Sequence, residues 1–121
     1  MQGKFLRSGK NNMEYNIELT EEFLDEIEEI CDYITNILKN EDASNRLREK
    51  VMYNVLLLEK SPEMFVEIEK TDKTERNYRK IVINNYVILY TVDKTEKNVY
   101  IAHIYYGGRN YMDNLVWIKI L

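Results

Sequence analysis

The spacing of the apolar residues changes once along the chain, and this change most limits the folds open to it. From Phe23 to Leu58, apolar residues recur every three or four positions, which is the spacing of one helix face. From Tyr78 to Tyr106, they are mostly β-branched or aromatic and stand in short runs between polar turns. A helical half followed by a strand half predicts an α+β domain in which helices pack on one face of a sheet.

Two helices are expected in the first half. Thr20 can cap a helix whose first turn is acidic, and a polar run at 40–42 separates it from a second helix over about 43–60. Pro62 ends the second helix, because the residue before a proline avoids the helical backbone conformation. The short turn between them predicts an antiparallel hairpin. Its inner face is expected to hold Phe23, Ile27, Ile30, Cys31, Ile34, Leu38, Leu47, Val51, Val55 and Leu58.

The strands are expected on either side of this hairpin. Alternating apolar residues over 14–19 predict an N-terminal strand. Asn84-Asn85 suits a two-residue turn because asparagine tolerates positive φ, so the later strands should form a three-stranded antiparallel meander. Those strands are expected over 78–83, 86–92 and 98–106.

The length of 121 residues suits one compact domain, assigned to residues 13–121. Residues 1–12 are polar and without periodicity, so a disordered extension or leader is expected there. No apolar run approaches the roughly 18 residues that cross a bilayer, and no secretory signal precedes the domain, which favours a cytoplasmic protein without a membrane partner. One histidine and one cysteine, Cys31, do not suffice for a structural zinc site, and no cofactor is expected. Cys31 is expected to be buried.

The charge is distributed unevenly. Residues 1–72 hold nine basic and 17 acidic residues, whereas residues 73–121 hold eight basic and four acidic ones. A basic working face can therefore exist on an otherwise acidic body, and the net charge of −4 does not exclude an anionic target.

Two later segments resemble the RelE/ParE superfamily of toxins. They read Y-R-K-I-V-I-N-N-Y-V-I-L-Y-T-V-D, residues 78–93, and V-Y-I-A-H-I-Y-Y-G-G-R-N-Y, residues 99–111. Tyr86 and Tyr90 match a tyrosine pair of the family, and Arg109 matches an arginine after the last strand. The resemblance covers about residues 14–115 and implies a RelE/ParE-like fold. It also implies a toxin of a type II toxin–antitoxin system that a cognate antitoxin neutralises.

The superfamily contains two mechanisms, and the resemblance favours the second. RelE-like toxins are ribosome-dependent endoribonucleases that cleave mRNA, and ParE-like toxins poison DNA gyrase. RelE-like proteins commonly have arginine directly after the tyrosine that Tyr86 matches, but this chain has Val87. Their late tyrosine or histidine acid is also missing, and only Tyr111 could replace it. A ParE-like gyrase poison is therefore expected, with a RelE-like nuclease or a non-toxic interaction module as the alternatives.

If the chain is an enzyme, the resemblance implies a metal-independent endoribonuclease whose catalytic residues are Arg109, Arg79, Lys80 and Tyr111. Arg109 follows two glycines at a strand end, where a guanidinium can bind phosphate or carboxylate in bidentate fashion, although a surface salt bridge is the simpler role. Arg79 and Lys80 should point to opposite faces of their strand, so at most one can join a given site.

The residues expected to bind the target are Arg109, Arg79, Lys80 and His103. His103 alternates with Val99, Ile101 and Tyr105, which predicts one shared face and favours a packed or hydrogen-bonded histidine over a catalytic one. The apolar tail 115–121 is expected to be buried, either on its own sheet edge or against a second copy of the chain in a homodimer.

Overall fold

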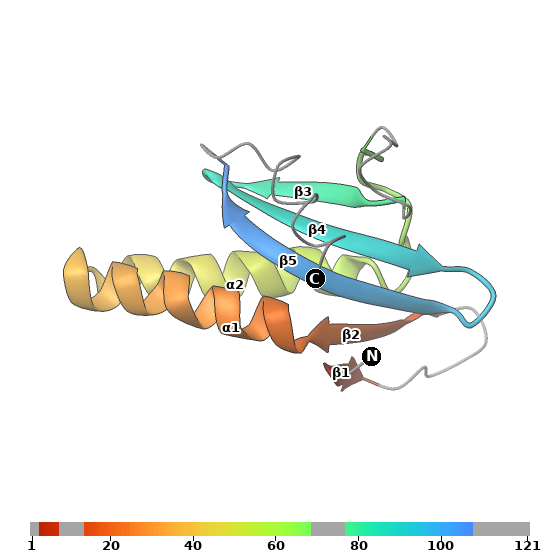
Figure 1. The fold of residues 1–121 in the computed structure, drawn as a ribbon, viewed down its shortest axis with the longest axis horizontal. Coiled ribbons are helices and arrows are strands. Elements are labelled where there is room, and N and C mark those ends of the chain that lie inside the picture. Colours follow the sequence, from red (N-terminus) through yellow and green to blue (C-terminus); the bar gives the residue numbers. More distant parts are fainter. Residues whose placement is uncertain (1–2, 8–13, 69–76, 108–121) are drawn as a thin grey trace.

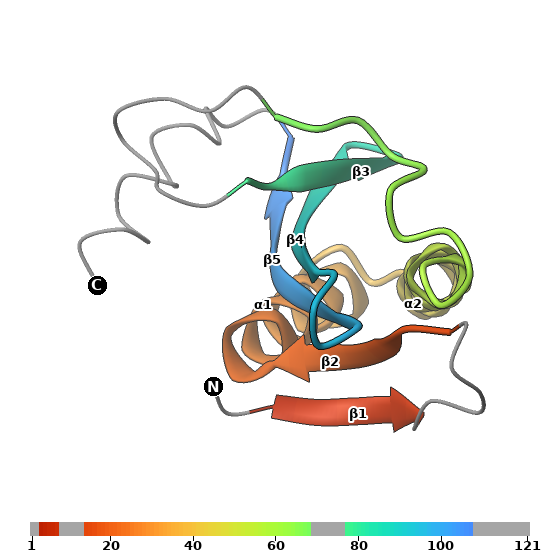
Figure 2. The ribbon, with the colours of Figure 1, turned by 90° about the vertical axis from the view of Figure 1, so that its right-hand side faces the viewer.

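A computed structural model describes residues 3–7, 14–68 and 77–107. Within these ranges, one mixed sheet with the strand order β1-β2-β5-β4-β3 packs against two antiparallel helices (Figures 1 and 2). The expected α+β fold is confirmed. The elements are β1 Gly3–Arg7, β2 Asn16–Thr20, α1 Glu21–Asp32, η1 Tyr33–Ile37, α2 Glu41–Leu57, β3 Arg79–Ile83, β4 Tyr86–Asp93 and β5 Asn98–Tyr106.

The two halves of the chain meet where β2 pairs with β5. This pairing is parallel, with Ile17 beside Val99 and Leu19 beside Ile101. The rest of the meander is antiparallel, as expected, and Asn84 has a φ of 54° in the turn between β3 and β4. β2 therefore joins the edge of the meander and completes its apolar face.

Residues 3–7 differ from the expectation for the N-terminal segment. They form β1, which pairs antiparallel with β2, although residues 1–12 carry no strand pattern of their own. The pairing has a physical reason, since the outer edge of β2 offers unpaired backbone groups to any nearby segment. The expectation of a disordered extension is therefore wrong for residues 3–7.

The junction between β2 and α1 is fixed by Thr20. Its hydroxyl oxygen accepts the Phe23 N–H at 3.2 Å and caps α1, and the hydroxyl donates to the Ile101 carbonyl of β5 at 2.8 Å. Two acidic residues in the first turn of α1 favour the same helix start through the helix dipole. Local capping and sheet contact thus place α1 directly beside β5.

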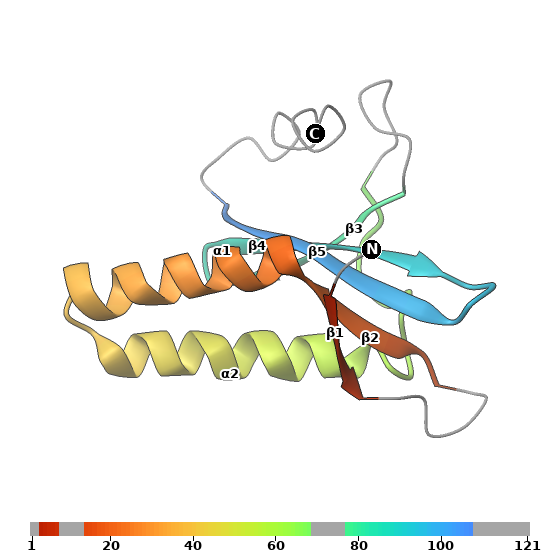
Figure 3. The same ribbon diagram turned by 60° about the horizontal axis from the view of Figure 1, so that its bottom comes forward.

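The helical hairpin turns through a widened segment. α1 continues into the π-helical turn η1, where the Leu38 N–H donates to the Tyr33 carbonyl at 3.1 Å. The Ser44 hydroxyl of α2 donates to the Cys31 carbonyl at 3.3 Å, which offers that carbonyl a partner outside its own helix. Asn40 then caps α2 by accepting the Ala43 N–H at 3.0 Å. The turn of the hairpin extends well beyond the sheet (Figure 3).

The main core lies between the helices and the sheet. Cys31 is only 1% exposed within it, which confirms its expected burial. None of the helices in the described ranges is long and apolar enough to span a membrane. The fully or almost fully buried core residues are Ile17, Leu19, Phe23, Ile27, Cys31, Ile34, Leu47, Val51, Val55, Leu58, Ile81, Ile83, Ile88, Tyr90, Val99, Ile101 and Ile104.

Candidate functional site

The sheet face turned away from the helices, here called the far face, brings two candidate residues together. Lys80 of β3 pairs with Leu89 of β4, and Leu89 pairs with His103 of β5. Two strand spacings therefore separate the backbones of Lys80 and His103, or about 10 Å. Both side chains are half-buried, and the apolar residues around them are Ile68, Tyr78, Val87, Leu89 and Tyr105.

His103 reaches the far face because β5 contains a bulge. Tyr90 pairs with Ile101 and Leu89 with His103, so Ala102 is an extra residue in β5. The expectation that His103 shares a face with Val99 and Ile101 is therefore wrong, since the extra residue reverses the alternation. His103 shares the far face with Tyr105, and the two rings stack at 5.8 Å with an interplanar angle of 9°.

The imidazole of His103 is held by a carboxylate from α1. Its Nδ1 lies 3.0 Å from Oε2 of Glu26, and Oε1 of the same carboxylate accepts the Ile104 N–H at 3.0 Å. The His103 side chain is 13% exposed. The expectation of a hydrogen-bonded strand histidine is confirmed. Glu26 was not a candidate, because its role depends on a contact between residues 77 positions apart.

Arg79 faces the helix side of the sheet. It holds the segment that follows α2, which is described over residues 58–68 and is here called the connector. Its guanidinium donates to the Phe65 carbonyl at 2.8 Å and to the Glu63 carbonyl at 3.2 Å. It also forms an ion pair with the Glu63 carboxylate at 3.4 Å. The donors of Arg79 are thus directed at the backbone and a carboxylate of this chain's own connector, and Lys80 lies on the opposite face, as expected.

The end of β5 approaches the β3–β4 turn closely. The Gly107 N–H donates to the Asn85 carbonyl, and a Cβ at Gly107 would lie 2.9 Å from that oxygen. Only glycine fits this approach without a shift of the turn. Beside it, the rings of Tyr86 and Tyr106 meet edge to face at 5.9 Å. Two further candidates, Arg109 and Tyr111, and the tail 115–121 lie outside the described residues.

This arrangement of elements and residues can be compared with known families. Residues 17–111 match the model of the family described as the ParE toxin of the type II toxin–antitoxin system parDE. The chain belongs to the ParE toxin family. It is therefore the toxin of a type II toxin–antitoxin system, and an antitoxin is its partner. A comparison with curated proteins finds no match.

The position after Tyr86 distinguishes this ParE toxin from the RelE pattern. Val87 pairs with Tyr105 across β4 and β5 and is 6% exposed in the apolar cluster of the far face. An apolar contact thus occupies the place where a RelE-like protein commonly carries a guanidinium. Within the described residues of this ParE toxin, no group of histidine, cysteine, aspartate and glutamate side chains could hold a metal ion.

Tyr90 of this ParE toxin anchors the connector from within the core. Its hydroxyl donates to the Pro62 carbonyl at 2.8 Å, and burial raises the pKa of Tyr90 to about 12. Tyr90→Phe should lower the free energy of unfolding by about 1–3 kcal/mol at neutral pH, because the buried Pro62 carbonyl loses its donor. Urea titrations followed by circular dichroism measure this loss.

The same tyrosine should make stability depend on alkaline pH. The folded protein holds the Tyr90 proton more tightly than the unfolded chain, so the contribution is complete below the ordinary pKa of 10.0 and declines as pH rises from there to about 12. The decline should be smaller in Tyr90→Phe than in the parent. Tyr53→Phe, at an exposed tyrosine of α2, is the control and should follow the parent curve. Equal alkaline curves for parent and Tyr90→Phe would contradict the assignment.

Proposed function

We propose that this toxin inhibits growth by poisoning DNA gyrase. The single observation that carries the proposal is Val87, which is buried in an apolar contact at the position that a RelE-like nuclease gives to arginine. The match to the ParE family points in the same direction. The antitoxin partner would block this activity.

The remaining candidates support the same choice over RNA cleavage. Cleavage of this kind needs an activated 2′-hydroxyl, stabilised charge on phosphorus and a protonated leaving oxygen, which requires several groups at close range. Arg79 is engaged by Glu63 and Phe65, and Leu89 stands between Lys80 and His103. Removing one donor that stabilises developing charge typically costs a factor of about 10² to 10³ in rate. Such a set would cleave RNA slowly.

The target would be bound by Arg109 beyond the end of β5, with Lys80 and His103 contributing from the far face. Arg79 would act indirectly by holding the connector against β3. Exposed tyrosine near this strand end suits a protein surface, because tyrosine is enriched at the centres of protein interfaces. Tyr106 is 53% exposed there.

Two assays with the purified toxin test the proposal. Gyrase supercoiling should be inhibited with accumulation of cleaved DNA, whereas mRNA on translating ribosomes should stay largely intact. Lys80→Ala should weaken gyrase inhibition more than Lys60→Ala, an exposed lysine after α2 that serves as the matched control. Rapid codon-positioned mRNA cleavage with normal gyrase activity would reverse the assignment to a nuclease that uses Arg79, Lys80, Arg109 and Tyr111. A chain that does neither, and that does not slow growth, would be an interaction module.

A further inference from the structure

The edge of β5 continues beyond the strand that pairs with it. β2 accompanies β5 only as far as Leu19 beside Ile101, and the chain then turns into α1. Beyond this point, side chains form hydrogen bonds with the main chain of β5 along the edge where no described strand pairs with it. The Thr20 hydroxyl contacts the Ile101 carbonyl at 2.8 Å, and the Glu26 carboxylate accepts the Ile104 N–H at 3.0 Å. A main-chain N–H of the sheet therefore fixes the position of Glu26.

The carboxylate so fixed determines the state of His103. Both oxygens of Glu26 lie near Nδ1, at 3.2 and 3.0 Å. A carboxylate only accepts hydrogen bonds, so Nδ1 must carry the hydrogen, and Nε2 of the neutral ring carries the lone pair. The hydrogen bonds of this ring to described residues are formed at Nδ1, and the His103 side chain is 13% exposed. The stack on Tyr105 fixes the plane of the same ring.

We propose that Glu26 is a positioning residue that holds His103 in the Nδ1–H tautomer and so presents Nε2 as a hydrogen-bond acceptor to the target. The inference rests on the proposed role of the far face in target binding. Glu26 itself would not touch the target, because its oxygens are engaged by Ile104 and His103.

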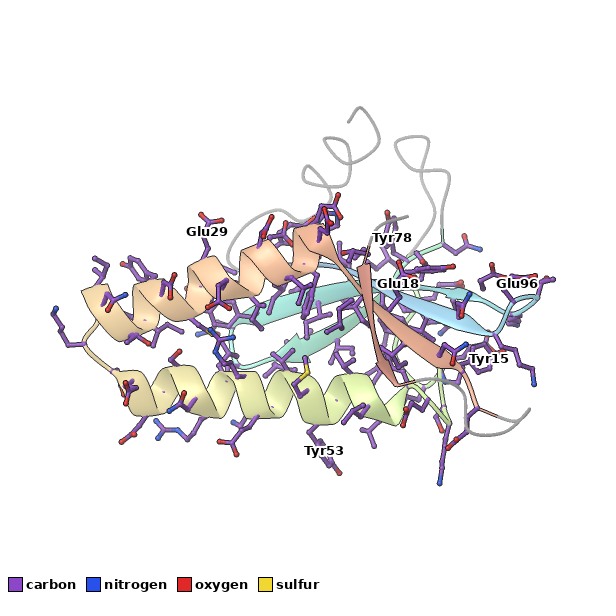
Figure 4. The ribbon with its side chains drawn as sticks, turned by 90° about the horizontal axis from the view of Figure 1, so that it is seen from below. Tyr15, Glu18, Glu29, Tyr53, Tyr78 and Glu96 are labelled. Atoms are coloured by element: carbon purple, nitrogen blue, oxygen red, sulfur yellow. The ribbon has the colours of Figure 1, made fainter. Side chains whose placement is uncertain are left out.

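The chemistry of this acceptor selects the group that it binds. The lone pair on Nε2 takes an N–H or O–H donor, whereas a phosphate oxygen has no hydrogen to offer. Glu22 and Glu29 lie about one helical turn on either side of Glu26 and are exposed, so their charges repel phosphate. Figure 4 shows Glu29 directed away from the hairpin. We therefore assign the contact at His103 to a donor on a protein surface, in preference to the phosphate backbone of the DNA that gyrase holds.

Nitrogen NMR of the histidine ring tests the first half of the proposal. At pH 8 the single histidine should be protonated on Nδ1 and bare on Nε2. In Glu26→Gln the side-chain amide can donate as well as accept, so the spectrum should shift to a mixture of both tautomers. Glu29→Gln, one turn along α1, is the matched control and should leave the spectrum unchanged. A parent ring protonated on Nε2, or an unchanged Glu26→Gln spectrum, would overturn the proposal.

Potency tests the second half. His103→Asn keeps an amide that can bond to Glu26 but removes the acceptor at Nε2. Glu26→Gln and His103→Asn should each raise the concentration that half-inhibits gyrase about tenfold, the effect of one hydrogen bond worth about 1.4 kcal/mol. Because Glu26 acts through His103, the double variant should half-inhibit gyrase at the same concentration as His103→Asn alone. Unfolding midpoints should stay at the parental value.

The outcomes separate this inference from the proposed function. Variants as potent as the parent, additive losses in the double variant, or losses that merely follow lower unfolding midpoints would each refute a positioning role. If the parent does not inhibit gyrase, the proposed function fails, and the same variants are compared by growth inhibition. The tautomer measurement requires no target and stands in either case.

Discussion

Phe23→Ala should lower the free energy of unfolding by about 3–5 kcal/mol, which is the usual cost of removing a buried phenylalanine ring. Phe23 is 0% exposed in the core between α1 and the sheet, and its N–H takes part in the cap on Thr20. Domains of this size are stable by only about 5–15 kcal/mol, so the variant should lose a large share of its stability. Urea unfolding followed by circular dichroism should show a lower midpoint with an unchanged slope.

Tyr53→Ala provides the control for this prediction. Tyr53 is 67% exposed, and Figure 4 shows it pointing away from α2. Its loss should change the free energy of unfolding by no more than about 0.5 kcal/mol. Equal effects of the two aromatic truncations would mean that α1 does not pack on the sheet through Phe23.

Arg109→Ala should reduce growth inhibition strongly without unfolding the toxin. Central arginines of protein interfaces often contribute about 2–4 kcal/mol to binding, which corresponds to a loss of affinity of roughly 30- to 1000-fold. A charged side chain beyond a strand end should matter little for folding, within about 0.5 kcal/mol. Growth curves on induction and half-inhibitory concentrations for gyrase measure the first effect, and urea unfolding measures the second.

Arg48→Ala is the matched control for Arg109. Arg48 lies on α2 and forms an exposed ion pair with Glu28 at 3.0 Å, far along the chain from the strand end. Its replacement should leave both toxicity and stability near the parental values. An Arg109→Ala variant that remains fully toxic, or that unfolds, would show that Arg109 is not the residue that carries activity.

The elements of the fold follow from local sequence because each has a local cause. The caps at Thr20 and Asn40 determine where α1 and α2 begin. Asn84 adopts the positive φ that its turn requires. The observed helix boundaries differ from the predicted ones by a few residues. The second helix begins directly after its cap and not after the whole polar run.

The register of the sheet does not follow from local sequence. The parallel pairing of β2 with β5 joins distant segments whose alternation would suit several partners. The bulge at Ala102 also cannot be predicted from the composition of β5, yet it determines which face of the sheet His103 occupies. β1 forms without any pattern, because it needs only the backbone edge of β2.

The sequence predicted which residue types form the candidate site better than it predicted the contacts that these residues make. The strand positions of Lys80 and Arg79 follow from alternation, and the structure separates them by face. That the guanidinium of Arg79 would serve the connector depends on the path of residues 62–68, which no helix or strand pattern describes. Glu26 belongs to an acidic helix face on which several carboxylates look equivalent.

The pairing of β2 with β5 has a consequence for the order in which the chain can fold during its synthesis. Asn16 and Asn98 are bonded side by side although 82 positions separate them, so the loop that they close spans most of the chain. Contacts of such long range form slowly and late, after the chain entropy of the whole loop has been lost. The α1–α2 hairpin can form early, but the sheet that carries Lys80 and His103 cannot be complete until β5 has left the ribosome. We therefore expect a nascent chain whose β5 has not yet emerged to be inactive against the target.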